Sequence, residues 1–277
     1  MLPRPTQAHV TLRRGRLYKY KSLKGFSYDH VCEILRDSVI YIPRPSQLND
    51  PMECRPLMAI GDIGDPTYRS KVNAWVRRCV THRIPPPTEK QIQQELAQLT
   101  QQRLEGLIRE ATALYHHEVD ARYRILSLSD SLTNHHLWYE YADNYEGVCL
   151  EFFVDPMLGS AYQMIYRDEV PFLDITNNEG FDALILTALV KRLQWQRESE
   201  YRLVFGDPPI PGDPPLINQR LQFPPNLLTS VIFGQNIAAD RQRNLIALAR
   251  GRHPKARCLV AFPDVKSASV GLRELEY

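Results

Sequence analysis

The chain has 277 residues and a formal net charge of +2 at pH 7, with 43% hydrophobic and 24% charged residues. This is the composition of an ordinary globular protein, and its charge is too small to indicate binding to nucleic acid or membranes. The five cysteines are scattered without a Cys-x-x-Cys pair, which argues against a disulfide framework or a zinc ribbon. Because no apolar leader follows Met1 and no stretch approaches a membrane span, we expect a cytoplasmic protein with no membrane partner.

The first elements in chain order are short. The patterns predict a strand, a helix and a second strand, over residues 16–20, 28–36 and 39–42. A loop rich in turn-forming residues then runs from Ser46 to Glu53. Asp50 precedes a proline, which favours extended backbone, and the Asn49 side chain can close a turn. The loop is either a structural turn or a means of presenting Asn49, Asp50 and Glu53 to a pocket.

Residues 68–121 have a helical pattern throughout, broken once by Pro85-Pro86-Pro87. After that break, Thr88 and Gln91 have the spacing of a capping box. No linker separates this segment from the remainder, so we interpret residues 1–277 as a single domain with a helical insertion at 68–121.

From Tyr123 onward, strand patterns dominate. We expect strands over 124–129, 147–153, 163–166, 216–223, 228–233, 257–262 and 270–275, and helices over 132–142, 181–193 and 239–250. The helices are not strictly interleaved with the strands. This order favours an α+β fold with a mainly antiparallel sheet core and peripheral helices.

The run from Trp195 to Phe205 crowds acids, arginines and aromatic residues at the edge of a predicted buried strand, whose composition is clearest from Tyr201 to Phe205. In an extended backbone, Glu198, Glu200 and Arg202 share one face, with Tyr201 and Leu203 on the other. Two carboxylates on one face repel each other unless a cation, a ligand or a catalytic demand compensates. The run is therefore either a ladder neutralised by Arg197 and Arg202 or part of a functional site.

Several familiar motifs are absent from the sequence: a Walker loop, a dinucleotide Gly-x-Gly-x-x-Gly, a Gly-x-Ser-x-Gly elbow and a His-Glu-x-x-His pair. The pairs His116-His117 and His135-His136 are sequence neighbours that point apart on a helix, so we expect no metal site there. Trp138 and Tyr141 lie three residues apart on one predicted helical face. They are either core residues or a stacking platform for a flat ring.

Five ordered blocks, between about residues 17 and 234, together resemble the bacterial family known as domain of unknown function 2971. The blocks are Tyr18-Lys19-Tyr20, Pro45 to Glu53, Leu126 to Ser129, Leu137 to Phe152, and Lys191 to Arg202. The chain departs from the family at His135-His136 and in the long helical insertion.

More distantly, the blocks are similar to the layout of ADP-ribosyltransferases. That layout has a Tyr, His or Arg on an early strand, a Ser-x-Ser strand, and Glu-x-Glu at a strand edge. The resemblance implies an ADP-ribosyltransferase-like fold and an NAD-dependent enzyme, of bacterial defence or toxin type, that transfers ADP-ribose or hydrolyses NAD. Glu200 would stabilise the oxocarbenium-like cation and Glu198 would orient or deprotonate the acceptor. The residues that we predict to bind NAD are Tyr18, Tyr20, Asn49, Ser127, Ser129, Trp138, Tyr141, Lys191 and Arg202.

Two alternatives remain. Asp50, Glu53, Glu198 and Glu200, with Lys191, suit a magnesium-dependent nuclease or phosphodiesterase. The acids could instead be fully salt-bridged in a non-catalytic binding module, such as the sensor of a defence system. The sequence identifies no acceptor, whether protein, nucleic acid or small molecule, and no oligomeric state.

Overall fold

A large curled sheet, mostly antiparallel, and several helices make up this mixed α/β protein. The computed structural model describes residues 11–13, 15–80, 83–154, 160–177, 180–209, 214–264 and 269–275. Within these residues the chain divides into two compact units, the smaller made of residues 52–119 and 169–190. The expected α+β class with a mainly antiparallel core is confirmed at this level. The ADP-ribosyltransferase-like fold and the single-domain organisation stay predictions.

The main sheet belongs to the larger unit and has nine strands among the described residues. Their order across the sheet is β1 (Leu12–Arg13), β7 (Ala161–Gln163), β11 (Glu200–Gly206), β5 (Tyr123–Ser129), β2 (Gly15–Lys21), β6 (Val148–Val154), β14 (Leu228–Gly234), β15 (Arg257–Asp264) and β16 (Ser269–Glu274). Of the registers that the structure gives for these strands, only β14 with β15 is parallel.

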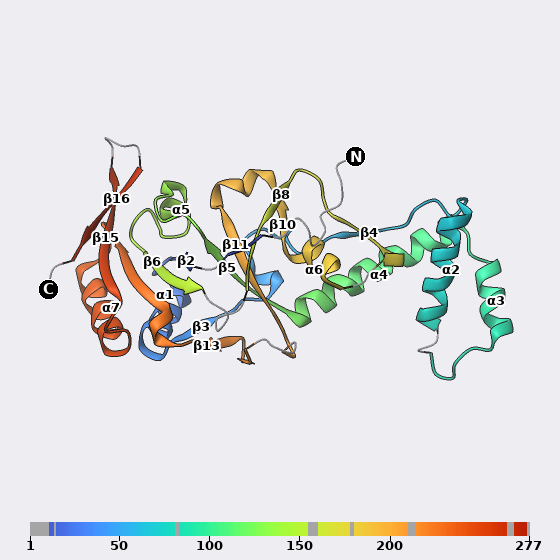
Figure 1. Cartoon of the computed structure of the whole chain (residues 1–277), viewed down its shortest axis with the longest axis horizontal. Coiled ribbons are helices and arrows are strands. Elements are labelled where there is room, and N and C mark those ends of the chain that lie inside the picture. The colour runs from blue at the N-terminus through green and yellow to red at the C-terminus, as the bar shows by residue number, and fades with distance from the viewer. Residues whose placement is uncertain are drawn as a thin grey trace. The chain divides into compact units, whose positions relative to one another are not determined.

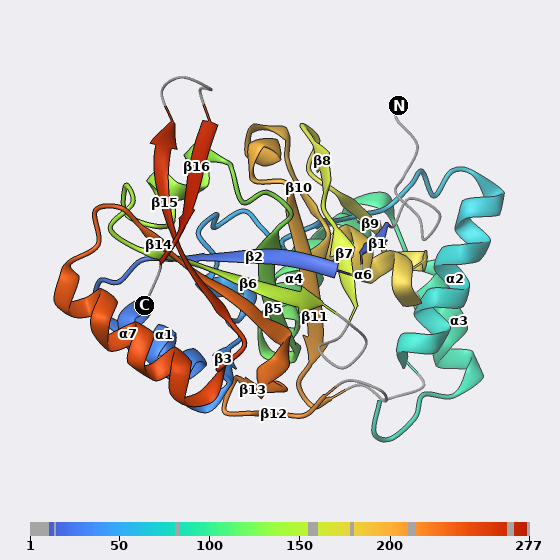
Figure 2. The ribbon, with the colours of Figure 1, turned by 60° about the vertical axis from the view of Figure 1, so that its left-hand side comes forward.

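Strand alternation divides the central strands into two chemically different faces. Helices α1 (Phe26–Asp37) and α7 (Ala239–Arg252) lie side by side (Figures 1 and 2) and share one apolar core with Leu17, Leu150 and Leu203. Helix α5 (His135–Glu140) shares a second core with Tyr20 and with other strand residues that point to the opposite face of the sheet from the first core. Since neighbouring residues in a strand point to opposite faces, Tyr18 and Glu200 lie on the α5 face.

The larger unit also holds two small sheets. One consists of β12 (Leu216–Ile217), β13 (Arg220–Gln222) and β3 (Val39–Tyr41), and the other pairs β10 (Val190–Arg192) with β8 (Ile165–Arg167). Our prediction of one strand over 216–223 is therefore wrong. Asn218 and Gln219 both have positive φ, 51° and 61°, and two such residues in succession turn the chain back on itself as a hairpin.

The smaller unit is mainly helical. It contains α2 (Pro66–Val80), α3 (Glu89–Ala97), most of α4 (Gln101–Arg122), α6 (Gly180–Ala188) and the parallel pair β4 (Leu57–Ala59) and β9 (Phe172–Asp174). Helices α2 and α3 lie side by side (Figure 1) around Val72, Val76, Ile92 and Leu96.

The helical character expected within residues 68–121 and the capping box are confirmed. The Thr88 side chain accepts a hydrogen bond from Gln91 N, and the Gln91 side chain accepts one from Thr88 N at 2.8 Å. The structure adds a second break, at residues 98–100, where one helix was expected. The helix expected over 181–193 is also shorter, because β10 begins at Val190. None of the helices in the described part of the chain is long and apolar enough to cross a membrane.

Candidate functional site

The run from Trp195 to Phe205 is not one continuous strand. A 3-10 turn covers Leu193–Glu198, Ser199 is left-handed with φ 46° and ψ 49°, and β11 begins at Glu200. A left-handed residue cannot continue an extended strand. Our placement of Glu198 in the strand, in alternation with Glu200, is therefore wrong, whereas Tyr201 and Leu203 do face the apolar core as expected.

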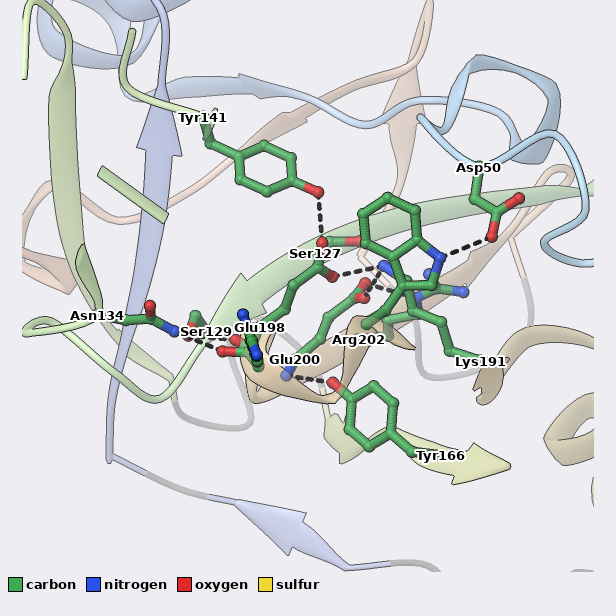
Figure 3. Close-up of polar contacts among 12 residues, drawn as sticks. Asp50, Ser127, Ser129, Asn134, Tyr141, Tyr166, Lys191, Glu198, Glu200 and Arg202 are labelled. Atoms are coloured by element: carbon green, nitrogen blue, oxygen red, sulfur yellow. Dashed lines mark hydrogen bonds and ion pairs between the residues drawn. The ribbon is translucent and has the colours of Figure 1, made fainter. Parts of the chain in front are cut away.

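One ammonium group nevertheless joins the two acids (Figure 3). Lys191 Nζ donates to Glu198 Oε2 at 2.5 Å and to Glu200 Oε2 at 2.8 Å. Arg202 Nε donates to the other oxygen of Glu200, Oε1, at 2.7 Å. The four side chains are buried, with exposed fractions between 1% and 7%. Buried charges need such partners, because an uncompensated ion is strongly disfavoured away from water.

Hydrogen bonds from three other elements fix the same two residues (Figure 3). Tyr141, at the end of α5, donates its hydroxyl to Glu198 Oε1. Ser129 Oγ in β5 donates to the Glu198 carbonyl at 2.7 Å, and Glu200 N donates to the Tyr166 hydroxyl in β8 at 2.8 Å. The two glutamates are therefore held from several sides.

The environments of the two carboxylates shift their pKa values in opposite directions. Burial raises the pKa of Glu198 above its ordinary value, and the Lys191 charge only partly offsets this. Burial also disfavours the charged form of Glu200, but the Arg202 and Lys191 charges outweigh it and hold the pKa of Glu200 well below its usual range. Glu200 is therefore an anion at neutral pH, whereas Glu198 is the carboxyl group that more readily takes a proton.

A row of polar residues continues from Glu200 across the main sheet. Ser129 is opposite Glu200 in the register of β5 with β11, and Tyr18 is opposite Ser129 in that of β2 with β5. Glu151 of β6 is opposite Tyr18, and Ser230 of β14 is opposite Glu151. Residues directly opposite each other share a face and lie one strand spacing apart, about 5 Å. The register thus aligns Tyr18, Ser129 and Glu200, which the sequence had indicated separately.

The loop around Asn49 and Asp50 also meets the acid cluster. Trp195 Nε1 donates to Asp50 Oδ2 at 2.9 Å, and the Trp195 ring centroid lies 5.0 Å from Lys191 Nζ. Burial raises the pKa of Tyr141 well above its ordinary value, with Glu198 adding to the rise and a hydrogen bond from Asn49 opposing it. The loop therefore contacts Trp195 and Tyr141, the two aromatic residues beside the carboxylates. This agrees with the hypothesis that the loop presents Asn49 and Asp50 to a site.

Two predicted NAD-binding residues have core contacts instead. Trp138 is fully buried, donates Nε1 to the Leu132 carbonyl at 3.1 Å and stacks on Tyr145 with 5.2 Å between ring centroids. Tyr20 is buried too, and its hydroxyl donates to the carbonyls of Ser131 and Leu132. Both side chains belong to the core beneath α5, so the structure favours the core interpretation for both residues.

The remaining predicted residues have mixed outcomes. Lys191 and Arg202 pair with the carboxylates, which favours a structural over a pyrophosphate-binding role for these two cations. The Ser127 carbonyl accepts a hydrogen bond from Lys19 Nζ at 2.8 Å. The Arg197 carbonyl accepts one from the Asn134 side chain.

Four residues at or near the site were not identified from the sequence: Lys19, Glu151, Tyr166 and Trp195. Burial lowers the pKa of Lys19 to about 7. Trp195 begins the acidic run of residues 195–205, and this position close to two glutamates in the sequence could have indicated it. Glu151 carries no such signal, because only the register of β6 with β2 brings it to the row. Tyr166 carries none either, because its hydroxyl reaches Glu200 N from β8, in a separate sheet.

Among the described residues, no group of three or more His, Cys, Asp and Glu side chains could hold a metal ion. Glu198 and Glu200 are each ion-paired with Lys191, and Glu200 also with Arg202.

No protein-family model, curated protein or solved structure matches the chain. The resemblance to the domain of unknown function 2971 family therefore stays a prediction from the sequence.

Proposed function

We propose that the protein cleaves the bond between nicotinamide and ribose in NAD, and transfers ADP-ribose to an acceptor or to water. The observation that carries this proposal is the pair of neighbouring carboxylates, Glu198 and Glu200, whose pKa values are shifted in opposite directions. Such a pair divides the work of stabilising a cation and accepting a proton between two residues. The alignment of Tyr18 and Ser129 with Glu200 supports the proposal.

Glu200 has the properties needed to stabilise developing positive charge. As the bond between ribose C1′ and the nicotinamide nitrogen breaks, its electron pair leaves with nicotinamide and C1′ becomes oxocarbenium-like. A carboxylate that is ionised and fixed beforehand needs no reorganisation to stabilise this cation. The contacts to Arg202, Lys191 and Tyr166 supply that fixation.

Glu198 is suited to the acceptor. An acceptor hydroxyl or water that attacks C1′ loses a proton, and a carboxylate with a raised pKa is the better base to receive it near neutral pH. Because Lys191 and Tyr141 occupy Glu198 in the structure, the acceptor must replace one of these contacts. We therefore expect acceptor binding, and not NAD binding, to disturb the Lys191–Glu198 pair.

The decisive experiment incubates the protein with NAD and measures released nicotinamide and labelled acceptor. Glu200→Gln should reduce nicotinamide release by at least about a hundredfold, since removing one preorganised electrostatic group costs about 10²–10³ in rate. Glu140→Gln is the matched control, because Glu140 is an exposed glutamate on α5.

A far-UV circular dichroism spectrum and a thermal melt of each variant establish that the fold is retained. Nicotinamide release that survives in a folded Glu200→Gln protein would contradict the assignment.

A specific observation favours a second candidate, the non-catalytic binding module. Both carboxylates are buried and ion-paired, which is the arrangement expected if their role is structural. In that case NAD raises the melting temperature or does nothing, and no nicotinamide is released by the wild-type protein. The same incubation therefore distinguishes the two functions.

A further inference from the structure

A second buried carboxylate lies in the polar row, two strands from Ser129. Glu151 is 3% exposed, and three hydroxyl groups donate to it: Tyr18 Oη to Oε1 at 3.2 Å, and Thr229 and Ser230 to Oε2 at 2.6 and 2.7 Å. The exposed Arg16 lies 3.8 Å from Oε1. The function proposed above makes no use of Glu151.

The fold departs from regular pairing to build this contact. Thr229 and Ser230 are consecutive in β14, so in a regular strand their side chains point to opposite faces. The register of β14 with β6 shifts between Leu228 and Ser230, and such a bulge re-aims side chains. As a result, both hydroxyls reach the same oxygen of Glu151.

The protonation states of the partners set the direction of the Tyr18 hydrogen bond. Burial opposes ionisation of Glu151, but the Ser230 and Thr229 hydrogen bonds outweigh it and lower the pKa of Glu151, so the group is an anion and only accepts. Burial and Glu151 raise the pKa of Tyr18 to about 12, so the phenol keeps its proton. That proton points to Glu151. The lone pairs of Tyr18 Oη are therefore left to accept a hydrogen bond from another group.

We propose that Glu151 is a positioning residue that holds the Tyr18 hydroxyl as a hydrogen-bond acceptor for the carboxamide N–H of a nicotinamide ligand. The inference rests on the proposed function. The backbones of Tyr18 and Glu200 lie about 10 Å apart, two strand spacings along the row. A nicotinamide riboside with C1′ beside Glu200 is long enough for its carboxamide to approach Tyr18 across Ser129. The site selects an amide, which donates, over a carboxylate, which does not.

Equilibrium binding of two probes tests this selection without relying on turnover. Nicotinamide mononucleotide and nicotinic acid mononucleotide differ only in the amide, and isothermal titration gives the Kd of each. The wild-type protein should bind the amide at least about tenfold more tightly, because the carboxylate has no N–H to donate to the Tyr18 hydroxyl.

In Glu151→Gln the introduced amide should donate to Tyr18 Oη, because Thr229 and Ser230 keep the side-chain oxygen. The Tyr18 proton then turns outward, and the preference should collapse to about onefold or invert in favour of the acid. Tyr18→Phe should also abolish the preference and make Glu151→Gln silent. A purely structural role would weaken both probes equally and leave their ratio unchanged.

Thr229→Val provides a milder variant if Glu151→Gln does not fold, because it removes one hydroxyl and keeps the side-chain shape. It should lower the preference partly, and Glu140→Gln should not change it. A wild-type protein that binds neither probe, or a folded Glu151→Gln protein that retains the full preference, overturns the inference. Nicotinamide release by the wild-type protein decides the proposed function separately, since selective binding does not require cleavage.

Discussion

At the residue scale, Lys191 neutralises two buried carboxylates at once. Its Nζ lies within 2.8 Å of an oxygen of both Glu198 and Glu200, and Arg202 pairs with Glu200 as well. Loss of the ammonium group therefore leaves Glu198 without its cation. Removing one partner of a buried ion pair is usually far more damaging than replacing the whole pair, because the remaining charge stays buried.

Lys191→Met should lower the free energy of unfolding at pH 7 by about 3–5 kcal/mol, the usual cost of breaking a buried pair. The double variant Lys191→Met/Glu198→Gln should recover part of this loss, because it removes the orphaned charge as well as its partner. Urea denaturation of the wild type and of the two variants measures both effects. If the double variant is no more stable than Lys191→Met, charge burial is not the cause of the loss.

The sequence predicted some of these residue roles for sound physical reasons. Strand alternation correctly placed Arg202 beside Glu200, and the Asn49-Asp50 loop does meet the site. The sequence did not predict that Lys191 bridges both carboxylates, because its distance to them depends on how β10 and the turn at residues 193–198 are folded. No spacing rule predicts the path of such a turn. The binding of Lys191 to a pyrophosphate stays a prediction.

At the element scale, Gly234 allows the end of β14 to lie close to the segment that follows α5. A Cβ on Gly234 would lie 2.1 Å from the Tyr145 carbonyl oxygen, and the same carbonyl accepts a hydrogen bond from Asn236 N at 2.9 Å. The backbone segments that carry Tyr145 and Gly234 therefore approach too closely for any side chain at residue 234.

Gly234→Ala should destabilise the protein by about 1–3 kcal/mol, the usual range for an overpacked core position. Gly251→Ala is the matched control: a Cβ there meets no atom within 4 Å, and the residue lies in the last turn of α7. Replacing a helical glycine by alanine should stabilise by up to about 1 kcal/mol. Thermal melts of both variants should shift in opposite directions, and equal shifts would contradict the close approach.

The positions of helices and strands were predicted correctly from hydrophobic periodicity where the periodic segment was long. The helices at residues 26–37 and 239–252 and the strands at 123–129 and 228–234 agree with expectation within a few residues. The predictions failed where one backbone conformation interrupts a good pattern. Ser199 is left-handed before β11, and Asn218-Gln219 turn the chain within an apparently continuous strand. Both interruptions occur at residues whose types tolerate, but do not demand, these conformations.

At the scale of the whole molecule, the two carboxylates give opposite contributions to the pH dependence of stability. The folded pKa of Glu200 is depressed, so its contribution is present above the unfolded pKa of about 4.3 and is lost as the pH falls through the folded pKa. The folded pKa of Glu198 is raised, so its contribution is present below the unfolded pKa and is lost as the pH rises through the folded pKa.

Glu200→Gln should therefore be destabilised most at neutral pH, on the order of 2–3 kcal/mol, and its deficit should shrink below about pH 4. The deficit of Glu198→Gln should change in the opposite sense and shrink as the pH rises. Urea denaturation of both variants and the wild type between pH 3 and 8 measures the two slopes. If the deficits of both variants changed in the same direction with pH, the opposite pKa shifts of Glu198 and Glu200 would be contradicted.

The sequence by itself determined the α+β class, most helices and strands, the helical insertion with its capping box, and the acidic run around Glu200. These depend on local periodicity and on side-chain chemistry within about ten residues, which a linear chain displays directly. Only the tertiary structure decided which groups neutralise the acids, that Trp138 and Tyr20 belong to a core, and that Tyr18, Ser129, Glu200 and Glu151 form one row. Those facts depend on strand order and register between segments that are far apart in the chain, some of them by more than a hundred residues. This long-range pairing is fixed by the burial of whole sheet faces and not by local pattern.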